Sequence, residues 1–115
     1  MQPLRAIAAC LLCVAWLHAA AFDDNDPYLG YFSAEIEGVM YSVNIERFDA
    51  TSYDGIFKIG DERFQFEGRR FGEQLGVRLA NETRQLQFRG NVQGAALILH
   101  AEDGQRFVLY RGSPE

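Results

Sequence analysis

The chain of 115 residues contains two cysteines, one tryptophan and two histidines. Both cysteines, Cys10 and Cys13, lie within the first 21 residues, and beyond that segment His100 is the single histidine. Without cysteine, the remainder of the chain has no disulfide, no thiol chemistry and no thiolate zinc site. One histidine also excludes a metal site built from several. No metal and no cofactor is therefore expected.

Positive charge is scarce as well. The 11 Lys and Arg residues are outnumbered by 16 Asp and Glu, which gives a net charge of −5. The first 21 residues hold one basic residue and no acidic one, so the rest of the chain carries −6. A charge of this sign argues against nucleic acid and against anionic membrane surfaces as partners.

Lysine is nearly absent beyond residue 21, where nine arginines accompany only Lys58. Four of these arginines are expected on one outer face of the middle hairpins: Arg63, Arg69, Arg78 and Arg89. Arginine suits bidentate contacts to carboxylate, sulfate or phosphate groups. We prefer the alternative, a ladder of solvent-exposed charges across neighbouring strands.

The sequence has one long apolar run, at its start. Residues 6–17 follow the single charge of Arg5 and precede a run of three alanines that ends at Ala21. This layout is typical of a secretory signal peptide, and the run is shorter than the roughly 20 residues that a spanning helix needs. Lipid attachment at Cys10 is the alternative. We predict export, to a bacterial periplasm or out of the cell, with cleavage near Ala21 and no stable membrane insertion of the mature chain.

No segment after residue 22 has the 3.6-residue apolar period of a helix. Residues 39–46 instead alternate, with apolar side chains on one face and polar ones on the other, which indicates a strand. Residues 22–28 are rich in aspartate and are predicted to form an acidic flexible leader. Residues 29–112 are predicted to form a single all-β domain. Its strands are expected at 30–36, 39–48, 53–59, 63–70, 75–79, 84–89, 95–100 and 106–111.

A short phrase recurs along the domain at residues 64–68, 86–90 and 108–112. An interval of about 22 residues is too short for a pair of helices but fits two short strands and two turns. Eight strands in consecutive hairpins make an antiparallel meander, and closing the meander removes its two exposed edges. We predict a small closed eight-stranded barrel, with a two-sheet sandwich as the alternative.

The alternation also predicts which side chains fill the interior. An eight-stranded barrel is just wide enough to be filled by side chains or to hold one small ligand, and this many large residues favour a filled core. The predicted inward residues are Tyr41, Val43, Ile45, Phe57, Phe64, Phe66, Leu75, Val77, Leu86, Phe88, Leu97, Leu99, Val108 and Tyr110.

The last hairpin departs from the earlier ones on its outward face. At positions shifted by 22 residues, polar or small side chains are replaced by Ile98, His100, Phe107 and Leu109. An exposed apolar patch usually marks an interaction site, so these four residues are the candidate binding residues. The alternative is an internal cover supplied by Leu29 or Phe32.

Three functions compete on these grounds. The first is an exported, non-enzymatic binding module that acts through a protein surface, as an inhibitor, an immunity-type protein or an accessory subunit, with a protein partner or self-association. The second is a barrel that binds a small apolar ligand, which an internal cavity open at one barrel end favours. The third, a hydrolase using two carboxylates, needs two acids facing each other across a cleft. We do not expect an enzyme, because no nucleophile and base occur in a recognisable arrangement.

Overall fold

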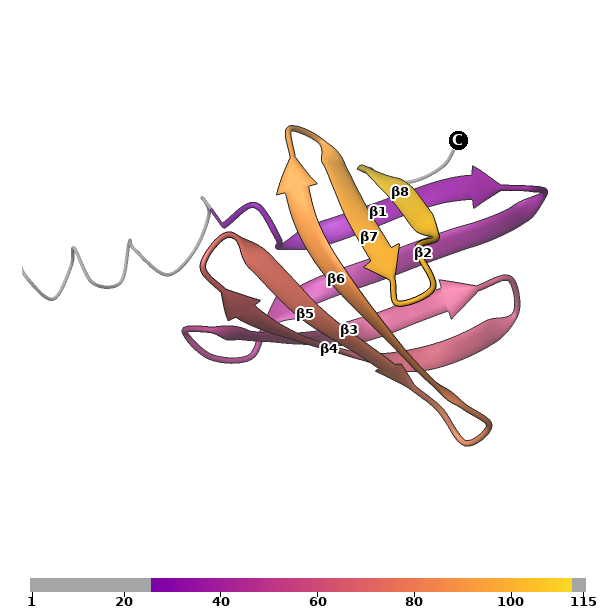
Figure 1. Cartoon of the computed structure of the whole chain (residues 1–115), viewed down its shortest axis with the longest axis horizontal. Coiled ribbons are helices and arrows are strands. Elements are labelled where there is room, and N and C mark those ends of the chain that lie inside the picture. Colours follow the sequence, from indigo (N-terminus) through magenta and orange to yellow (C-terminus); the bar gives the residue numbers. More distant parts are fainter. Residues whose placement is uncertain (1–25, 113–115) are drawn as a thin grey trace, which may run out of the picture.

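The computed structural model describes residues 26–112. The predicted signal peptide and residues 22–25 of the predicted leader lie outside the described residues. The described part contains the strands β1 (Gly30–Ile36), β2 (Val39–Arg47), β3 (Ser52–Ile59), β4 (Glu62–Phe71), β5 (Gln74–Ala80), β6 (Gln85–Gln93), β7 (Ala96–Ala101) and β8 (Arg106–Arg111). Each strand pairs antiparallel with its neighbours in sequence, and β8 pairs with β1 (Figure 1). The predicted closed eight-stranded meander is therefore confirmed, and the sandwich is excluded.

The connections between strands gather at the two ends of the barrel. In an antiparallel meander, alternate turns lie at the same end. We call one end the mouth; it carries the turns at residues 37–38, 60–61, 81–84 and 102–105. The other, the cap end, carries the turns at residues 48–51, 72–73 and 94–95 together with the entering segment 26–29. The two ends are built differently, and this difference positions the site.

Strand β8 presents the opposite face from the predicted one. Leu109 is fully buried, whereas Tyr110 is 58% exposed. The register of β5 with β6, shifted by 22 residues, would place His100 opposite Leu109, but His100 pairs with Arg106, three residues away. Because successive side chains of a strand alternate between faces, an odd slip turns the whole strand over. The predicted outward orientation of Phe107 and Leu109 is therefore wrong, and both point into the barrel.

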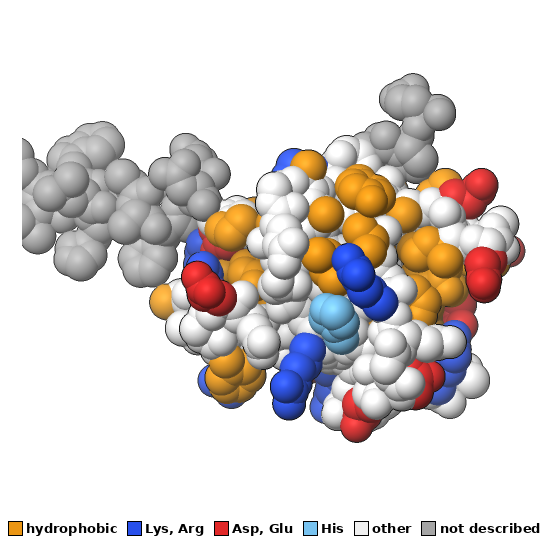
Figure 2. All heavy atoms as spheres, turned by 45° about the horizontal axis from the view of Figure 1, so that its top comes forward, with side chains coloured by type: hydrophobic (Ala, Val, Ile, Leu, Met, Phe, Trp, Pro, Cys, Tyr) orange, Lys and Arg blue, Asp and Glu red, His pale blue; other side chains and the backbone are white. Residues whose placement is uncertain are grey.

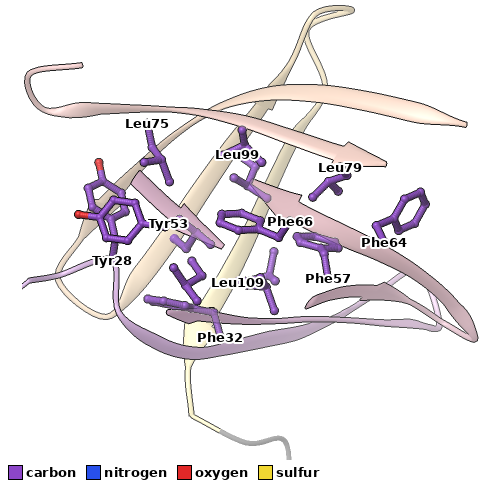
Figure 3. Close-up of a cluster of buried hydrophobic side chains, with 14 residues drawn as sticks. Tyr28, Phe32, Tyr53, Phe57, Phe64, Phe66, Leu75, Leu79, Leu99 and Leu109 are labelled. Atoms are coloured by element: carbon purple, nitrogen blue, oxygen red, sulfur yellow. The ribbon is translucent and has the colours of Figure 1, made fainter. Parts of the chain in front are cut away.

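The core runs along the barrel axis and agrees with the alternation elsewhere. Figure 3 shows aromatic and leucine side chains converging from opposite walls. Nine of the predicted inward residues are buried: Val43, Ile45, Phe57, Phe64, Phe66, Leu75, Val77, Leu97 and Leu99. Tyr41, Leu86 and Phe88 are partly exposed and pack against this core. The prediction is wrong for Val108 and Tyr110, which point outward because of the β8 slip.

The entering segment closes the cap end. Tyr28 is 2% exposed and packs against Tyr53, with ring centroids 5.6 Å apart. The carboxylate of Asp26 accepts hydrogen bonds of 2.5 Å from the Tyr53 hydroxyl and from Arg47. It also lies 3.7 Å from the Arg70 guanidinium, and its side chain is only 3% exposed. The predicted flexible leader is therefore wrong from Asp26 onward, because these residues plug the barrel.

The protonation of the plug follows from its contacts. Burial alone would raise the pKa of Asp26, but the hydrogen bonds from Tyr53 and the Tyr28 backbone and the charges of Arg47 and Arg70 together hold it below its usual value. Burial and the neighbouring carboxylate raise the pKa of Tyr53 to about 12. The cap is thus a stable pair of an ionised aspartate and a neutral tyrosine at neutral pH.

The barrel closes by a short seam. Strands β1 and β8 share two residue pairs, Phe32 with Arg111 and Ser33 with Tyr110, whereas β1 and β2 pair along all seven residues of β1. Both seam pairs lie towards the cap end. Residues 106–109 of β8 are therefore held by β7 alone, and the barrel wall is least constrained at the mouth.

Candidate functional site at the mouth of the barrel

The mouth contains a pocket of about 410 Å³ that opens to solvent. Its apolar lining comes from the inward faces of five strands: Tyr41, Phe57, Ile59, Leu86, Phe88, Leu99 and Phe107. Phe57 and Leu99 are each 1% exposed, whereas Tyr41, Phe88 and Phe107 are partly exposed. The pocket is therefore the core continued to the surface. Its volume lies within the range of about 300–1,000 Å³ that is usual for small-molecule sites.

Two local features leave this space open. No residue plugs the mouth in the way that Tyr28 and Tyr53 plug the cap end. Ala101 also lies opposite Phe88 on the inward face, where its small side chain leaves room that a leucine or phenylalanine would fill. The prediction of a filled core is thus correct for the cap end and the middle of the barrel but not for the mouth.

Three aromatic rings are arranged around the opening. Tyr41 and Phe107 stack, with ring centroids 5.6 Å apart and an interplanar angle of 25°. Phe88 meets Phe107 edge-on, at 5.8 Å and 87°. Such geometries are the favourable ones for aromatic pairs, so the rings hold one another in place. They present both a face and an edge to whatever enters.

The rim of the pocket is polar and acidic. Arg84 is bound to Glu62 by two hydrogen bonds, of 3.1 and 2.7 Å, so its charge is already matched. The pair raises the pKa of Arg84 and lowers that of Glu62. Glu102 and Asp103, on the turn between β7 and β8, form no ion pair within residues 26–112. The rim therefore carries uncompensated negative charge.

The predicted binding residues do not form one site. Ile98 and His100 point outward on β7, as predicted, although Ile98 is only 6% exposed. Phe107 lines the mouth, and Leu109 belongs to the core. An outer apolar patch does exist beside Ile98, but its other members are Val108 and Tyr110, which the β8 slip turns outward. The predicted internal cover fits in part, because Phe32 and Leu109 both lie in the core cluster.

Periodicity alone did not indicate the mouth as a site. Tyr41, Leu86 and Phe88 read as ordinary core residues, because alternation shows which face a side chain occupies but not how close it lies to a barrel end. The one available signal was Ala101, a small residue at an inward position near a turn.

The arrangement offers binding rather than chemistry. The acids lining the pocket, Glu102 and Asp103, are neighbours on one turn instead of facing each other across it, as the hydrolase alternative requires. Within the described residues, no group of three or more His, Cys, Asp or Glu side chains could hold a metal ion. Residues 26–112 also contain no helix long and apolar enough to cross a bilayer.

Comparison with known proteins adds no functional information. No family model matches the chain, and no curated protein and no solved structure matches it either. The function is therefore argued from the geometry of the barrel itself.

Proposed function

We propose that this protein is a non-enzymatic binding barrel that takes the apolar body of a small molecule into its mouth. One observation carries the proposal: the barrel is plugged at the cap end but has an apolar pocket of about 410 Å³ that opens at the mouth. An open, water-filled apolar surface of this kind is costly, and a ligand that covers it gains the free energy of burial.

The lining indicates the class of ligand. The stacked and edge-on rings of Tyr41, Phe88 and Phe107 suit a flat aromatic or unsaturated body. The unpaired carboxylates of Glu102 and Asp103 disfavour an anionic head group, since like charges repel across the rim. The ligand is therefore apolar with a neutral or cationic polar end. The weak seam between β1 and β8 gives it a route of entry.

The proposal is tested with a neutral aromatic probe, N-phenyl-1-naphthylamine, whose fluorescence rises in an apolar site. We expect saturable binding to the purified protein. Ala101→Phe fills the pocket at a partly exposed position and should weaken binding by at least tenfold without unfolding the barrel. Phe48→Ala is the matched control, because Phe48 is 69% exposed on a cap-end turn. Absence of saturable binding, or equal binding by Ala101→Phe and the parent protein, contradicts the proposal.

A second candidate is the predicted surface-binding module. The observation that favours it is the outer apolar patch of Ile98, Val108 and Tyr110, of which Tyr110 is 58% exposed. This candidate is weaker than the first, because two of its four predicted residues lie inside the barrel and Ile98 is already covered. It expects association with a protein partner, or with a second copy, to be lost when Tyr110 is replaced.

A further inference from the structure

An acidic protein carries a basic groove on the outside of its barrel. The groove has a volume of about 710 Å³ and crosses β4, β5, β6 and β7. Its charged lining consists of Arg69, Arg78, Arg89 and Glu102, with His100 among them. Three guanidinium groups against one carboxylate leave a local charge of about +2 in a chain whose net charge is −5. The positive charge is therefore concentrated, not spread over the surface.

The basic residues lie directly opposite one another across the strands. Gly76 pairs with both Arg69 and Arg89, and His100 pairs with both Arg89 and Arg106. Figure 2 shows the histidine of the described part with Lys or Arg side chains on either side. Like charges in such positions destabilise a sheet. None of the ion pairs within residues 26–112 involves Arg89, His100 or Arg106, so no carboxylate of the described part offsets this repulsion.

One charge in the groove is only loosely committed. Arg78 lies 3.6 Å from Glu67, but both side chains are about half exposed, at 49% and 58%. Pairs as exposed as this one contribute little, and Arg78 can exchange Glu67 for a stronger anion. The solvated ladder expected from the sequence accounts for Arg78 and Glu67. It does not account for the unmatched row beside them.

The floor of the groove is a glycine that the backbone does not require. Gly76 is not among the residues with positive φ, so its value lies in the missing side chain. A Cβ there would come within 3.3 Å of the Phe71 ring, which leans over Gly76 and is itself 65% exposed. Glycine inside a strand often marks a place where a ligand approaches the backbone closely. An exposed ring beside such a floor can stack on a flat group.

From these observations we propose that the groove binds a phosphate monoester carried on a flat ring. A phosphate monoester carries a charge of about −1.5 to −2 at neutral pH, which balances the local charge of the lining. Arginine forks bind its oxygens in bidentate fashion, and the ring of the ester lies over Gly76 against Phe71. This site is on the outer face and differs from the mouth pocket in ligand charge, so it stands or falls independently of the proposed function.

The test measures binding of phenyl phosphate, phenyl sulfate and inorganic phosphate to the purified protein by calorimetry in 50 mM salt. We expect saturable binding with phenyl phosphate the tightest. Phenyl sulfate carries one charge fewer, and inorganic phosphate lacks the ring. Arg89→Gln should weaken phenyl phosphate binding about tenfold, corresponding to one lost charge-assisted contact of about 1.4 kcal/mol. Phe71→Ala should reduce its affinity to that of inorganic phosphate.

The matched control is Arg63→Gln, which makes the same change in net charge on the same outer face of β4. Arg63 pairs with Lys58 and does not line the groove, so this variant should bind within twofold of the parent protein. Equal losses in Arg63→Gln and Arg89→Gln would mean a general charge effect and overturn the proposal. So would a lack of saturable binding by all three probes, or phenyl sulfate binding as tightly as phenyl phosphate. Thermal melting of each variant without ligand confirms that it is folded, because all three positions are exposed.

Discussion

Replacing Asp26 by asparagine should open the cap end of the barrel. The Asp26 carboxylate receives hydrogen bonds from the Tyr53 hydroxyl and the Arg47 guanidinium. An amide group at this position keeps the oxygen that accepts from the Tyr28 backbone, but it turns a donor towards at least one of two other donors. Asp26→Asn therefore loses the charge and leaves partners facing a group that cannot accept from both.

The magnitude follows from the burial of the contacts. Hydrogen bonds to a charged group contribute about 1.5–3 kcal/mol each, and breaking a buried pair from one side costs about 3–5 kcal/mol. The Asp26 side chain is 3% exposed, but the side chains of Arg47 and Arg70 are 21% and 37% exposed, which places the cost at the lower end. We expect a loss of about 3 kcal/mol in the free energy of unfolding. For a domain of this size that lowers Tm by roughly 12–24 °C.

The loss should depend on pH with a definite sign. The pKa of Asp26 is lowered by folding, so its contribution is fully present above the unfolded value, near 3.8, and is lost as the pH falls through the folded value. The pKa of Tyr53 is raised to about 12, so its contribution is present below pH 10 and is lost as the pH rises from there. The stability difference between parent and Asp26→Asn should therefore be constant from pH 6 to 8 and shrink below pH 4.

Urea denaturation across this pH range, with calorimetry at pH 7, measures both expectations. Asp61→Asn is the control, because Asp61 is exposed in the β3–β4 turn and should change Tm by less than the parent's experimental scatter. A cycle with Tyr53→Phe isolates the coupling between the two side chains. If Asp26→Asn melts together with Asp61→Asn at pH 7, the plug contributes nothing and the reasoning is refuted.

Two further predictions concern strand faces and close approaches. Leu109→Ser should lower the free energy of unfolding by about 3 kcal/mol or more, because Leu109 is fully buried, whereas Tyr110→Ser should leave stability nearly unchanged and reduce any association measured by sedimentation equilibrium; the reverse order of stabilities would restore the periodic register. Gly55→Ala should unfold the domain or nearly so, since its Cβ would lie 1.9 Å from the Asn44 carbonyl oxygen, while Gly76→Ala meets only the movable Phe71 ring and should cost less than about 1 kcal/mol by the same urea assay; similar costs for both would contradict the contact argument.

Most of the fold was predictable from the sequence because its signals are local. Alternation over single strands predicted the seven strands from β1 to β7 and their inward faces, and glycine-containing turns predicted the hairpins. The same reasoning failed in β8, where residues 107–110 are all apolar. A strand with two apolar faces carries no alternation, so only the interval of 22 residues was left to assign them, and the actual turn does not keep that interval.

The cap was not predictable for a different reason. A cluster of aspartates at residues 23–26 indicates a solvated segment when it is considered alone. What orders Asp26 is a set of partners 21 and 27 residues away, Arg47 and Tyr53, which only the closed barrel brings to the same end. The volume of the mouth was hidden in the same way, because it depends on which inward residues lie beyond the last ring of the core.

The error in β8 and the candidate site have the same cause. Had β8 kept the register of β6, Val108 and Tyr110 would point inward and Phe107 would lie outside. Because the strand slips by three residues, Phe107 lies opposite Leu99 and stacks on Tyr41 at the mouth. The slip also leaves residues 106–109 without partners on β1, since the seam pairs only Phe32 and Ser33. One departure from the repeat therefore supplies both an aromatic wall and a loosely held edge beside it. A binding pocket needs both of these, and a strictly repeating barrel would have neither.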